Sequence, residues 1–600
     1  MATTLHNTDV NLDGLLEVLG KNLYSSPSVA IREIVQNAHD ACIRRKIEAQ
    51  DDIDLKINIT VDSLANTLTI KDNGSGLTQQ EVKQYLATIG SGYTRILRNQ
   101  SQTDEMIGYF GLGFLSAYVI SDKVEVWTTS YQTPEQSWRF VSKGGKQFSI
   151  SSCKNRDIGT TVKLKLKDSF KELSSENVLQ SLLAKYCCML PISIYLMGNN
   201  QPVNHLVCPW RMNRDSSQLL VKKESLKFAQ IFEENFEPIC VIPIPKDNDL
   251  NVNGLIWIQD SSGFSTSDYR NVSLFVRNMF ITDEGRELLP LWAGFIGCVV
   301  ESNQLTPTAS REDIQKDDAY YDLQDLLAST LIQGLKHIAQ NEAENWRRIV
   351  TRHNQSLTGA AVNDDDLFEI LQNEIKLPSS YGEMTIAALL SKSNNKLYLR
   401  NEDSNSYEDL LFKAKMIPVV SGYLFAVASF CCKYSDIFNV EIIELGTKSG
   451  NEQLFITFDP EPTVKHKLET LMQTQGDELL FTEFVPEHIA MIIIDNQDVL
   501  LKKRIEQDET DKKIGKAALI LAKMHTQTIN DEFVRKVYIN MQSPLIKRLI
   551  ELKHDDERSK QLSQLLRAFT ITLCHNTLDE TVDFNDELIK FSQTLLETFS

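Results

Sequence analysis

The stretch Ala30-Ile-Arg-Glu-Ile-Val-Gln-Asn-Ala-His-Asp-Ala-Cys42 puts three polar residues into a helix that should otherwise pack in a core. A rotation of about 100° per residue places Glu33, Asn37 and Asp40 within about 60° of one another. Apolar residues fill the remaining arc, as in a helix packed on a sheet: Ile31, Ile34, Val35, Ala38 and Cys42. The polar stripe is therefore either a solvated face or part of a functional site.

The composition is that of a multidomain globular protein. The length of 600 residues predicts about three to four domains. The chain is 42% hydrophobic and 24% charged, with a net charge of −19 and a pI near 5.1. This charge argues against a protein that wraps nucleic acid or lies on anionic lipid by bulk electrostatics, although it is compatible with a local basic groove.

The cysteines and the chain start favour a reduced, cytoplasmic setting. None of the ten cysteines forms a CxxC motif, and the first residues contain no apolar signal segment. The longest apolar run, residues 288–300, is interrupted by Pro290 and is too short to span a bilayer. We expect it to be buried core.

An acid followed by glycines ends the first predicted hairpin. Residues 53–61 and 67–71 alternate between apolar and polar side chains, which predicts two antiparallel strands. Lys71-Asp-Asn-Gly-Ser-Gly76 follows directly. It is either a surface turn or a place where the backbone approaches a ligand while Asp72 accepts a hydrogen bond from it.

A second glycine cluster leads into an apolar helix at 115–120. It reads Ile107-Gly-Tyr-Phe-Gly-Leu-Gly-Phe114, which is not the dinucleotide-binding order. Free amides at a helix N-terminus still favour phosphate. The segment between the clusters, from about residue 85 to 113, is expected to be a mobile flap.

Together these motifs resemble the four nucleotide-binding motifs of the GHKL ATPases. They are Glu-x-x-x-Asn-x-x-Asp, Asp-x-Gly-x-Gly, Gly-x-x-Gly-x-Gly-Phe and a Gly-Thr that leads a strand. Within this superfamily, the residues in and around the motifs most resemble those of the ninety-kilodalton heat-shock chaperones, including bacterial high-temperature protein G. The basic residue that this family usually carries in its flap is absent, and Gly90-Ser-Gly-Tyr stands there instead.

The resemblance implies a role for each motif residue, with ATP and Mg²⁺ as ligands. Glu33 would orient and polarise the attacking water, Asn37 would hold Mg²⁺, and Asp72 would accept from the adenine amino group. A carboxylate and an amide one helical turn apart suit water and metal independently of the name. The remaining implied site residues are Asp40 and Arg44 as a brace, Gly76 beside the base, Gly108, Phe110, Gly111, Gly113 and Phe114 around the phosphates, and Thr160 at the adenine end through water.

A loop in the second part of the chain, Thr308-Ala-Ser-Arg-Glu-Asp-Ile-Gln315, contains the other candidate catalytic group. An exposed arginine is ordinarily a surface ion pair of little energetic weight. In the family, the arginine of this Ser-Arg-Glu loop reaches the terminal phosphate. The resemblance thus implies that Arg311 acts across domains and that Gln315 holds the loop, so hydrolysis would depend on domain closure.

The implied architecture is a multidomain α+β protein. It comprises a GHKL (Bergerat) α/β sandwich at 1–212, an α/β middle domain at 213–455 and an α+β dimerisation domain at 456–600. Two amphipathic helices are expected near 556–575 and 584–599. The family uses such a pair as a dimer contact, although a helix pair at a chain end can also be tertiary core.

The leading functional prediction is a homodimeric, ATP-driven chaperone that acts on unfolded client proteins. No stable nucleic-acid binding and no membrane association are expected. The alternatives that keep the same pocket are a mismatch-repair or topoisomerase ATPase, a histidine kinase, and a nucleotide-gated scaffold with little hydrolysis. DNA handlers normally present a lysine where this chain has Arg311, and only nine residues are available before Val10 for a phosphoacceptor helix.

Overall fold

The computed structural model divides into two compact units, residues 1–353 and 354–600. The structure describes all residues except 1–26, 50–52, 87–112, 146, 206, 214, 234, 247, 263–266, 309–312, 402–410, 413–414, 446–453, 475, 514, 527–532, 553–556 and 575–600. The domain boundaries predicted at 212/213 and 455/456 remain predictions.

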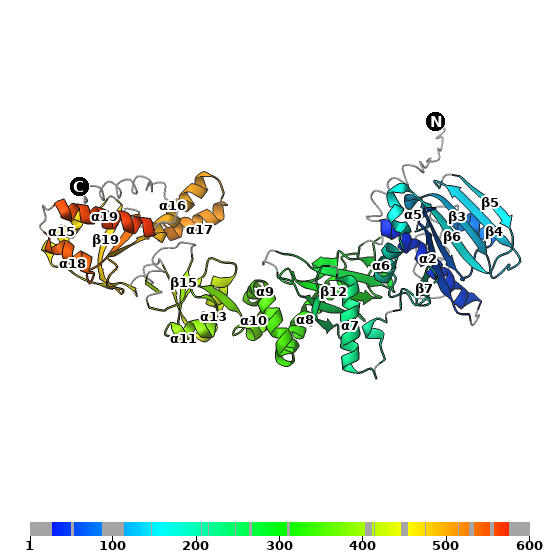
Figure 1. The fold of residues 1–600 in the computed structure, drawn as a ribbon, viewed down its shortest axis with the longest axis horizontal. Coiled ribbons are helices and arrows are strands. Elements are labelled where there is room, and N and C mark those ends of the chain that lie inside the picture. Colours follow the sequence, from blue (N-terminus) through cyan, green and yellow to red (C-terminus); the bar gives the residue numbers. More distant parts are fainter. Residues whose placement is uncertain are drawn as a thin grey trace, which may run out of the picture. The chain divides into compact units, whose positions relative to one another are not determined.

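The first unit begins with a seven-stranded sheet in the order β5-β4-β3-β6-β2-β1-β7 (Figure 1). The predicted hairpin is confirmed, since β1 and β2 are antiparallel with Ile59 opposite Ile70. Alternation of apolar and polar residues buries one side of this hairpin, including Ile57 and Leu68. The strands are β1 (Lys56–Asp62), β2 (Thr67–Asp72), β3 (Ser121–Thr129), β4 (Ser137–Lys143), β5 (Gln147–Cys153), β6 (Gly159–Leu166) and β7 (Ser193–Leu196).

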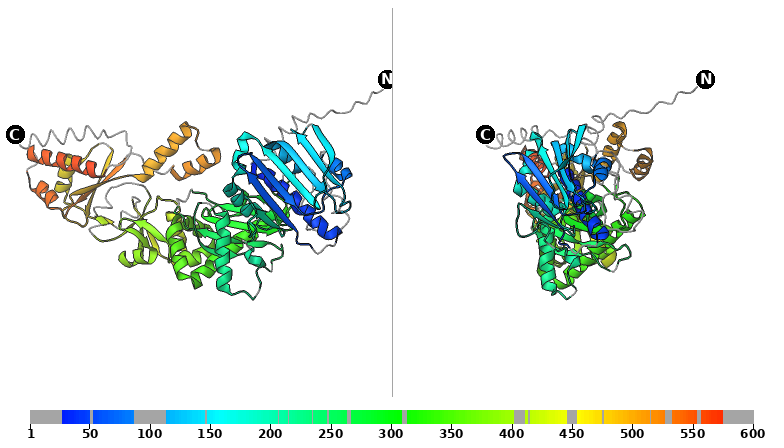
Figure 2. Two further views of the ribbon diagram at one scale, coloured as in Figure 1. Left: turned by 45° about the vertical axis from the view of Figure 1, so that its right-hand side comes forward. Right: turned by 90° about the vertical axis from the view of Figure 1, so that its right-hand side faces the viewer.

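The long helix α2 (Pro27–Glu48) covers the buried side of this sheet and contacts β2 and α5 (Figures 1 and 2). Its first residue is proline, whose fixed φ suits the first helical position. A capping box between Thr78 and Glu81 starts the next helix. The remaining elements here are α3 (Gln79–Glu81), η2 (Val82–Leu86), η3 (Gly113–Leu115), α5 (Ser116–Ile120), η4 (Asp168–Ser174) and α6 (Glu176–Tyr186).

A five-stranded sheet follows, in the order β11-β10-β12-β9-β8. The sequence predicts one strand over 271–280, and this is wrong. The chain instead forms a two-residue hairpin at Arg277 and Asn278, whose φ values of 53° and 65° are those of a type I′ turn. The elements are η5 (Pro209–Arg211), α7 (Gln218–Phe232), β8 (Pro238–Pro243), β9 (Asn253–Gln259), β10 (Asn271–Val276), β11 (Met279–Thr282), η6 (Gly285–Leu288) and β12 (Ile296–Ser302).

The core of this second sheet is built around Trp257. Its indole lies against Gly297 on the neighbouring strand, where an added Cβ would approach the ring to 2.0 Å. Its Nε1 donates to the buried carboxylate of Glu233 at 2.9 Å, and Gln259 Nε2 donates to the same carboxylate oxygen at 2.8 Å. Strand β12 is buried throughout, as the apolar run 288–300 predicts, whereas Leu291 of the same run is 86% exposed.

Helices α8 (Asp318–Asn341) and α9 (Ala343–Asn363) come next. The sequence predicts that residues 319–350 are helical, which is confirmed except at one position that divides them into two helices. The chain breaks at Glu342, which has φ −131° and ψ 62°. No proline or glycine stands at this position, so the sequence gives no stop signal there.

The second unit contains two further sheets, in the orders β14-β13-β16-β15-β17 and β18-β19-β21-β20. Phe412 and Ile443 from the first part of this unit share one apolar cluster with Ile492 and Tyr538 from the last part. The strands are β13 (Lys376–Ser379), β14 (Gly382–Thr385), β15 (Lys396–Arg400), β16 (Val419–Ser421), β17 (Glu441–Glu444), β18 (Ile456–Thr457), β19 (Asp477–Glu483), β20 (Met491–Asp495) and β21 (Arg535–Asn540).

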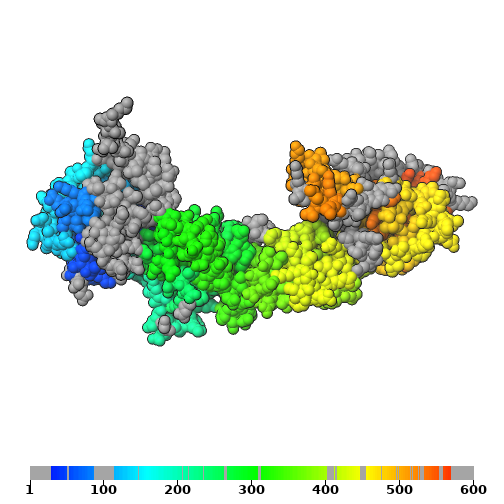
Figure 3. Space-filling model, turned by 180° about the vertical axis from the view of Figure 1, so that it is seen from behind, coloured from blue at the N-terminus to red at the C-terminus, as the bar shows by residue number. Residues whose placement is uncertain are grey.

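Helices α11, α13 and α19 pack on these sheets, and α16 and α17 contact each other and form the orange projection of the second unit in Figure 3. Asp364 caps α10 by accepting from Leu367 N at 2.8 Å. The helices are α10 (Asp365–Leu371), α11 (Ile386–Lys392), α13 (Val427–Phe438), α15 (Pro462–Met472), α16 (Gln497–Thr510), α17 (Lys516–Thr526), α18 (Pro544–Glu551) and α19 (Glu557–Cys574). In the described part of the chain, no helix is both long and apolar enough to cross a membrane.

Candidate functional site

The polar stripe of α2 is largely buried. Glu33 is 4% exposed and Asp40 is 6% exposed, while Asn37 between them is exposed. Burial of two carboxylates costs free energy unless partners compensate it. A merely solvated stripe does not account for this arrangement, and the stripe therefore has the burial expected of a site.

Glu33 is paired with its neighbour Arg32. Arg32 Nη2 lies 3.3 Å from Glu33 Oε1, and Nη1 donates to the carbonyl oxygens of Phe280 and Ile281, each at 3.3 Å. The arginine is only 2% exposed. It thus links the candidate catalytic carboxylate to strand β11 of the second sheet, and Lys185 adds an ion pair to Asp283 at 3.1 Å nearby.

The sequence reasoning missed Arg32. The feature that could have indicated its role is the position of an arginine among Ile31, Ile34 and Val35. A guanidinium group buried there must find hydrogen-bond acceptors.

The other charged residues of α2 have defined partners. His39 Nδ1 lies 3.3 Å from Asp40 Oδ1. Arg44 donates to Glu48 at 3.0 Å and to Glu81 at 2.7 Å. These contacts brace the C-terminal half of α2 against the segment after β2, while a direct role of Asp40 and Arg44 at a ligand remains a prediction.

Asp72 lies at the end of β2, fully withdrawn from solvent. Its Oδ1 accepts from Gly74 N at 2.8 Å and from Thr160 N at 3.2 Å. Burial raises the pKa of this carboxyl to about 7, although the two amide hydrogen bonds act in the opposite direction. Both of these hydrogen bonds reach the same oxygen, so the geometry suits a carboxylate whose other oxygen accepts from a ligand.

Thr160 belongs to a hydroxyl pair beside Asp72. Its Oγ1 lies 3.1 Å from Thr128 Oγ1, and Thr128 Oγ1 also accepts from Leu77 N at 2.8 Å. The sequence reasoning missed Thr128. Strand β3 carries it into line with the start of β6, since Thr128 and Thr160 are register partners.

The glycines after Asp72 are required by backbone packing. Gly76 has φ +62°, and a Cβ there would lie 1.9 Å from the carbonyl oxygen of Thr129. Gly74 lies against the backbone of α2, where Ser75 N donates to Ala41 O at 2.9 Å. These contacts hold the Asp72 turn against α2, and the approach of a base to Gly76 remains a prediction.

Several predicted site residues fall outside the described part of the chain, namely Gly108, Phe110, Gly111 and Arg311. Gly113 begins η3, and the Phe114 ring packs edge-on against Tyr118 and Phe140, with centroids 6.0 and 6.3 Å away. Phe114 therefore has a packing role in addition to any ligand contact.

The predicted Arg311 loop is closed at its base by contacts of its flanking residues. Gln315 N donates to Thr306 O at 2.8 Å, and Pro307 forms an isolated bridge with Ile314. Gln315 is exposed, and its side chain reaches Pro307 O at 3.4 Å. This geometry agrees with a residue that holds a loop.

The metal prediction rests on Asn37 alone. Within the described ranges, no group of three or more His, Cys, Asp or Glu side chains could hold a metal ion. A single exposed amide fits Mg²⁺, which usually keeps several waters and takes its other ligands from substrate phosphates. The residues present thus fit a metal that is bound mainly through a nucleotide.

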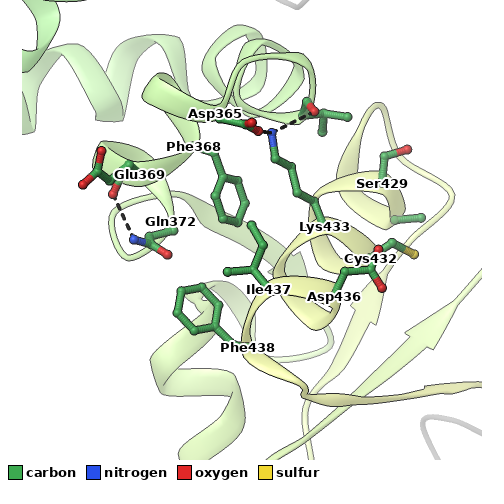
Figure 4. A pocket seen from close by; sticks show the side chains of 12 residues that line it. Asp365, Phe368, Glu369, Gln372, Ser429, Cys432, Lys433, Asp436, Ile437 and Phe438 are labelled. Carbon is green, nitrogen blue, oxygen red and sulfur yellow. Dashed lines mark hydrogen bonds and ion pairs between the residues drawn. The ribbon is translucent and has the colours of Figure 1, made fainter.

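A cavity lies in the other unit, between α10 and α13 (Figure 4). Phe368, Ile437 and Phe438 line it, with Lys433 beside the Phe368 ring and paired to Asp365 at 2.7 Å. None of the residues predicted for the site lines it.

Two parts of the chain match known protein families. Residues 24–172 match the family described as "Histidine kinase-, DNA gyrase B-, and HSP90-like ATPase". This range holds α2, strands β1 to β6, Asp72 and Thr160, and it is thus similar to the GHKL ATPases. Residues 214–391 match the family described as "Hsp90 protein", which includes the second sheet and helices α8 and α9. Over these residues the chain is thus similar to Hsp90 proteins.

The similar proteins include some that are named as chaperones and one that is named as a heat shock protein. "Chaperone protein HtpG" of Helicobacter pylori (strain ATCC 700392 / 26695) is 28% identical over 410 residues, covering 62% of this chain and 65% of the relative. The protein of the same name from Wolinella succinogenes is 26% identical over 402 residues, covering 62% and 64%. "Heat shock protein 75 kDa, mitochondrial" of Rattus norvegicus is 28% identical over 357 residues, covering 57% and 50%. The chain thus matches less than two thirds of the length of these relatives.

Proposed function

We propose that the chain is an ATP-dependent molecular chaperone, a homodimeric clamp in which ATP binding and slow hydrolysis drive cycling on unfolded client proteins. The observation that carries the proposal is the buried Glu33 beside the exposed Asn37, on a helix to which the Asp72 turn is hydrogen-bonded. A carboxylate and an amide on one helix, near a hydrogen-bond acceptor, meet the positioning needs of phosphoryl transfer. The similarity to proteins named as chaperones supports the rest.

In this proposal each group of site residues has one role. Asp72 accepts from the adenine amino group through its second carboxylate oxygen, and Thr160 assists through water. The glycines at 108, 111 and 113 approach the phosphates, because backbone amides at a helix start favour anions. Asn37 is the protein ligand of Mg²⁺, and Glu33 orients the attacking water.

Arg311 completes the site on domain closure in this proposal. The support is indirect: contacts at its base hold the loop, and Arg32 joins α2 to β11 within the same unit. An arginine that arrives only on closure makes turnover slow and dependent on conformation. Dimerisation through the C-terminal helices and a cytoplasmic location belong to the same proposal.

Two substitutions test the catalytic roles. Glu33→Ala should bind ATP yet hydrolyse it at least about a hundredfold more slowly, because water is no longer oriented. Arg311→Ala should lower kcat with near-normal ADP affinity. Glu176→Ala, an exposed carboxylate on α6, is the matched control and should leave turnover unchanged. Unchanged turnover in Glu33→Ala would sink the role of Glu33, and a large loss of ADP binding in Arg311→Ala would show that Arg311 has another role.

The choice between a chaperone and a DNA-handling ATPase is tested by stimulation. Steady-state ATP turnover is measured alone, with an unfolded client protein and with plasmid DNA. The proposal expects a change of turnover with the client and none with DNA. Stimulation by DNA alone would favour the DNA-handling class, and binding without measurable turnover would favour a nucleotide-gated scaffold.

A further inference from the structure

The outward side of the first sheet is strongly basic. Four adjacent strands carry this charge, β4, β3, β6 and β2. Their side chains that alternate with the buried ones form three rows by register. The first row is Lys143, Lys123, Lys165 and Thr67, the second is Val141, Glu125, Lys163 and Thr69, and the third is Arg139, Trp127, Thr161 and Lys71. We call these twelve positions the lysine face. Six cations and one anion give it a charge of +5, on a chain whose net charge is −19.

Like charges stand directly opposite one another on this face. Lys123 is the register partner of both Lys143 and Lys165. Directly opposed like charges destabilise a sheet. Glu125 compensates in part, since it lies 2.6 Å from Lys123 Nζ and 2.5 Å from Arg139 Nη2. The row of three lysines is therefore unfavourable for folding alone, which points to a ligand.

These cations are accessible. The side chains of Lys71, Lys123 and Arg139 are 50%, 36% and 42% exposed, and Lys143 and Lys165 are exposed. The flanking strand β5 contributes only Gln147, Ser149 and Ser151 to the same side. An anionic partner can thus reach the whole width of the four strands.

The aromatic residue of the face distinguishes between anionic partners. Two guanidinium groups lie over the Trp127 ring, Arg139 at 5.5 Å and Arg156 at 5.4 Å from its centroid. The indole is therefore engaged by the protein's own cations, whereas single-stranded nucleic acid is usually held on aromatic rings that stack with bases. Arg139 already donates from Nη2 to Glu125, and the remaining N–H groups of the two arginines suit further carboxylates.

The size of the face leads to the same choice. Four strands span about 15 Å, whereas charges are screened over about 8 Å at physiological salt. A long polyanion or a membrane would extend onto the acidic remainder of the surface. A short acidic segment would not extend beyond the lysine face.

We propose that the lysine face binds an acidic segment, rich in Asp and Glu, of a partner polypeptide. This interaction surface does not depend on nucleotide chemistry. The carboxylates of the segment pair with the lysine row and with the guanidinium groups held at Trp127.

Fluorescence anisotropy of the full-length chain tests the proposal. The probes are a fluorescein-labelled peptide of alternating Glu and Ser and an oligothymidylate of equal charge. Vesicles that contain phosphatidylserine are tested in a sedimentation assay. The peptide should bind, with an affinity that falls as salt rises. Tighter binding of the oligonucleotide, binding of the vesicles alone, or no binding of the peptide at low salt would each overturn the proposal.

A charge-neutralised variant tests the location. Lys123→Gln, Lys143→Gln and Lys165→Gln together should weaken peptide binding at least about tenfold, since three charge-assisted contacts are lost. The matched control neutralises three exposed lysines elsewhere, Lys223, Lys246 and Lys415, and should bind as the parent does. The lysine-face variant should also melt no lower than the parent, because the repulsion is relieved. Equal losses in both variants would overturn the proposal, because they would show binding by net charge alone.

Discussion

At the scale of single residues, the titration of Asp72 offers a direct test of ligand recognition. Its buried carboxyl has a pKa raised to about 7. Because Oδ1 accepts from two amides, the proton of the neutral form would occupy the second oxygen, which would then donate instead of accepting from the amino group. ADP affinity should therefore rise with pH, by about tenfold between pH 6 and pH 8. Calorimetric titration at several pH values measures this ADP affinity. A diphosphate of the nucleoside that lacks the amino group is the matched ligand, because its phosphates titrate in the same way.

The corresponding substitution is Asp72→Asn. It should abolish ADP binding, because the amide must then donate or present a weaker acceptor in a buried place. Retained affinity would remove Asp72 from the adenine site, and an equal pH slope for both ligands would assign that slope to the phosphates.

Gly76 separates packing from recognition. Gly76→Ala forces a Cβ to within 1.9 Å of Thr129 O at a φ of +62°, so we expect the first domain to lose several kcal/mol of unfolding free energy, about 3 or more. Gly144→Ala is the matched control, since it has φ +58° with open space around it. It should cost about 1 kcal/mol. Urea unfolding compares the two, and equal losses would mean that φ alone matters.

Roles that depend on the spacing of residues within one helix were predictable from the sequence. Roles that depend on contacts with residues far along the chain were not. The spacing of Glu33, Asn37 and Asp40 suffices to place them on one face of a helix. Arg32 could not be assigned in the same way, because its acceptors are carbonyl groups of Phe280 and Ile281, about 250 positions away. Burial of a charge depends on partners that only the fold brings together.

At the scale of secondary-structure elements, the packing of α9 on the second sheet should be sensitive to acid. The His353 ring stacks on Phe295 at 3.9 Å, and its Nε2 lies 2.9 Å from Gln259 O. Burial lowers the pKa of this imidazole to about 4. Between pH 6.5 and 4 the unfolded chain binds a proton that the folded chain does not, so stability should fall as pH falls, by about 3 kcal/mol at most.

Pulse proteolysis in urea at several pH values measures this loss. His353→Gln keeps a donor toward Gln259 O but does not titrate. Its stability should therefore vary less between pH 6.5 and 4 than that of the parent. An unchanged profile would show that other groups cause the acid sensitivity.

Elements were predicted where their periodicity is regular. The hairpin of β1 and β2 follows from simple alternation. The turn at Arg277 and Asn278 was missed because type I′ turns are usually marked by glycine. The break at Glu342 was missed because neither proline nor glycine marks it, so the ends of α8 and α9 are set by tertiary contacts.

At the scale of the whole molecule, the proposed clamp requires two copies. The helix predicted at 584–599 lies outside the described residues and presents Leu588 and Leu595 seven positions apart, on one face. Leu588→Glu together with Leu595→Glu should convert a dimer into a monomer at micromolar concentration, because two charges would be buried without partners. Gln593→Glu, on another side of the same helix, is the control and should leave the dimer intact. Light scattering after gel filtration measures the mass.

ADP affinity of this double variant should not change, since the described walls of the proposed site lie between α2 and β6. ATP turnover should fall if hydrolysis needs closure of both copies. A monomeric parent chain, or a dimer that survives both substitutions, would contradict the assignment of these helices.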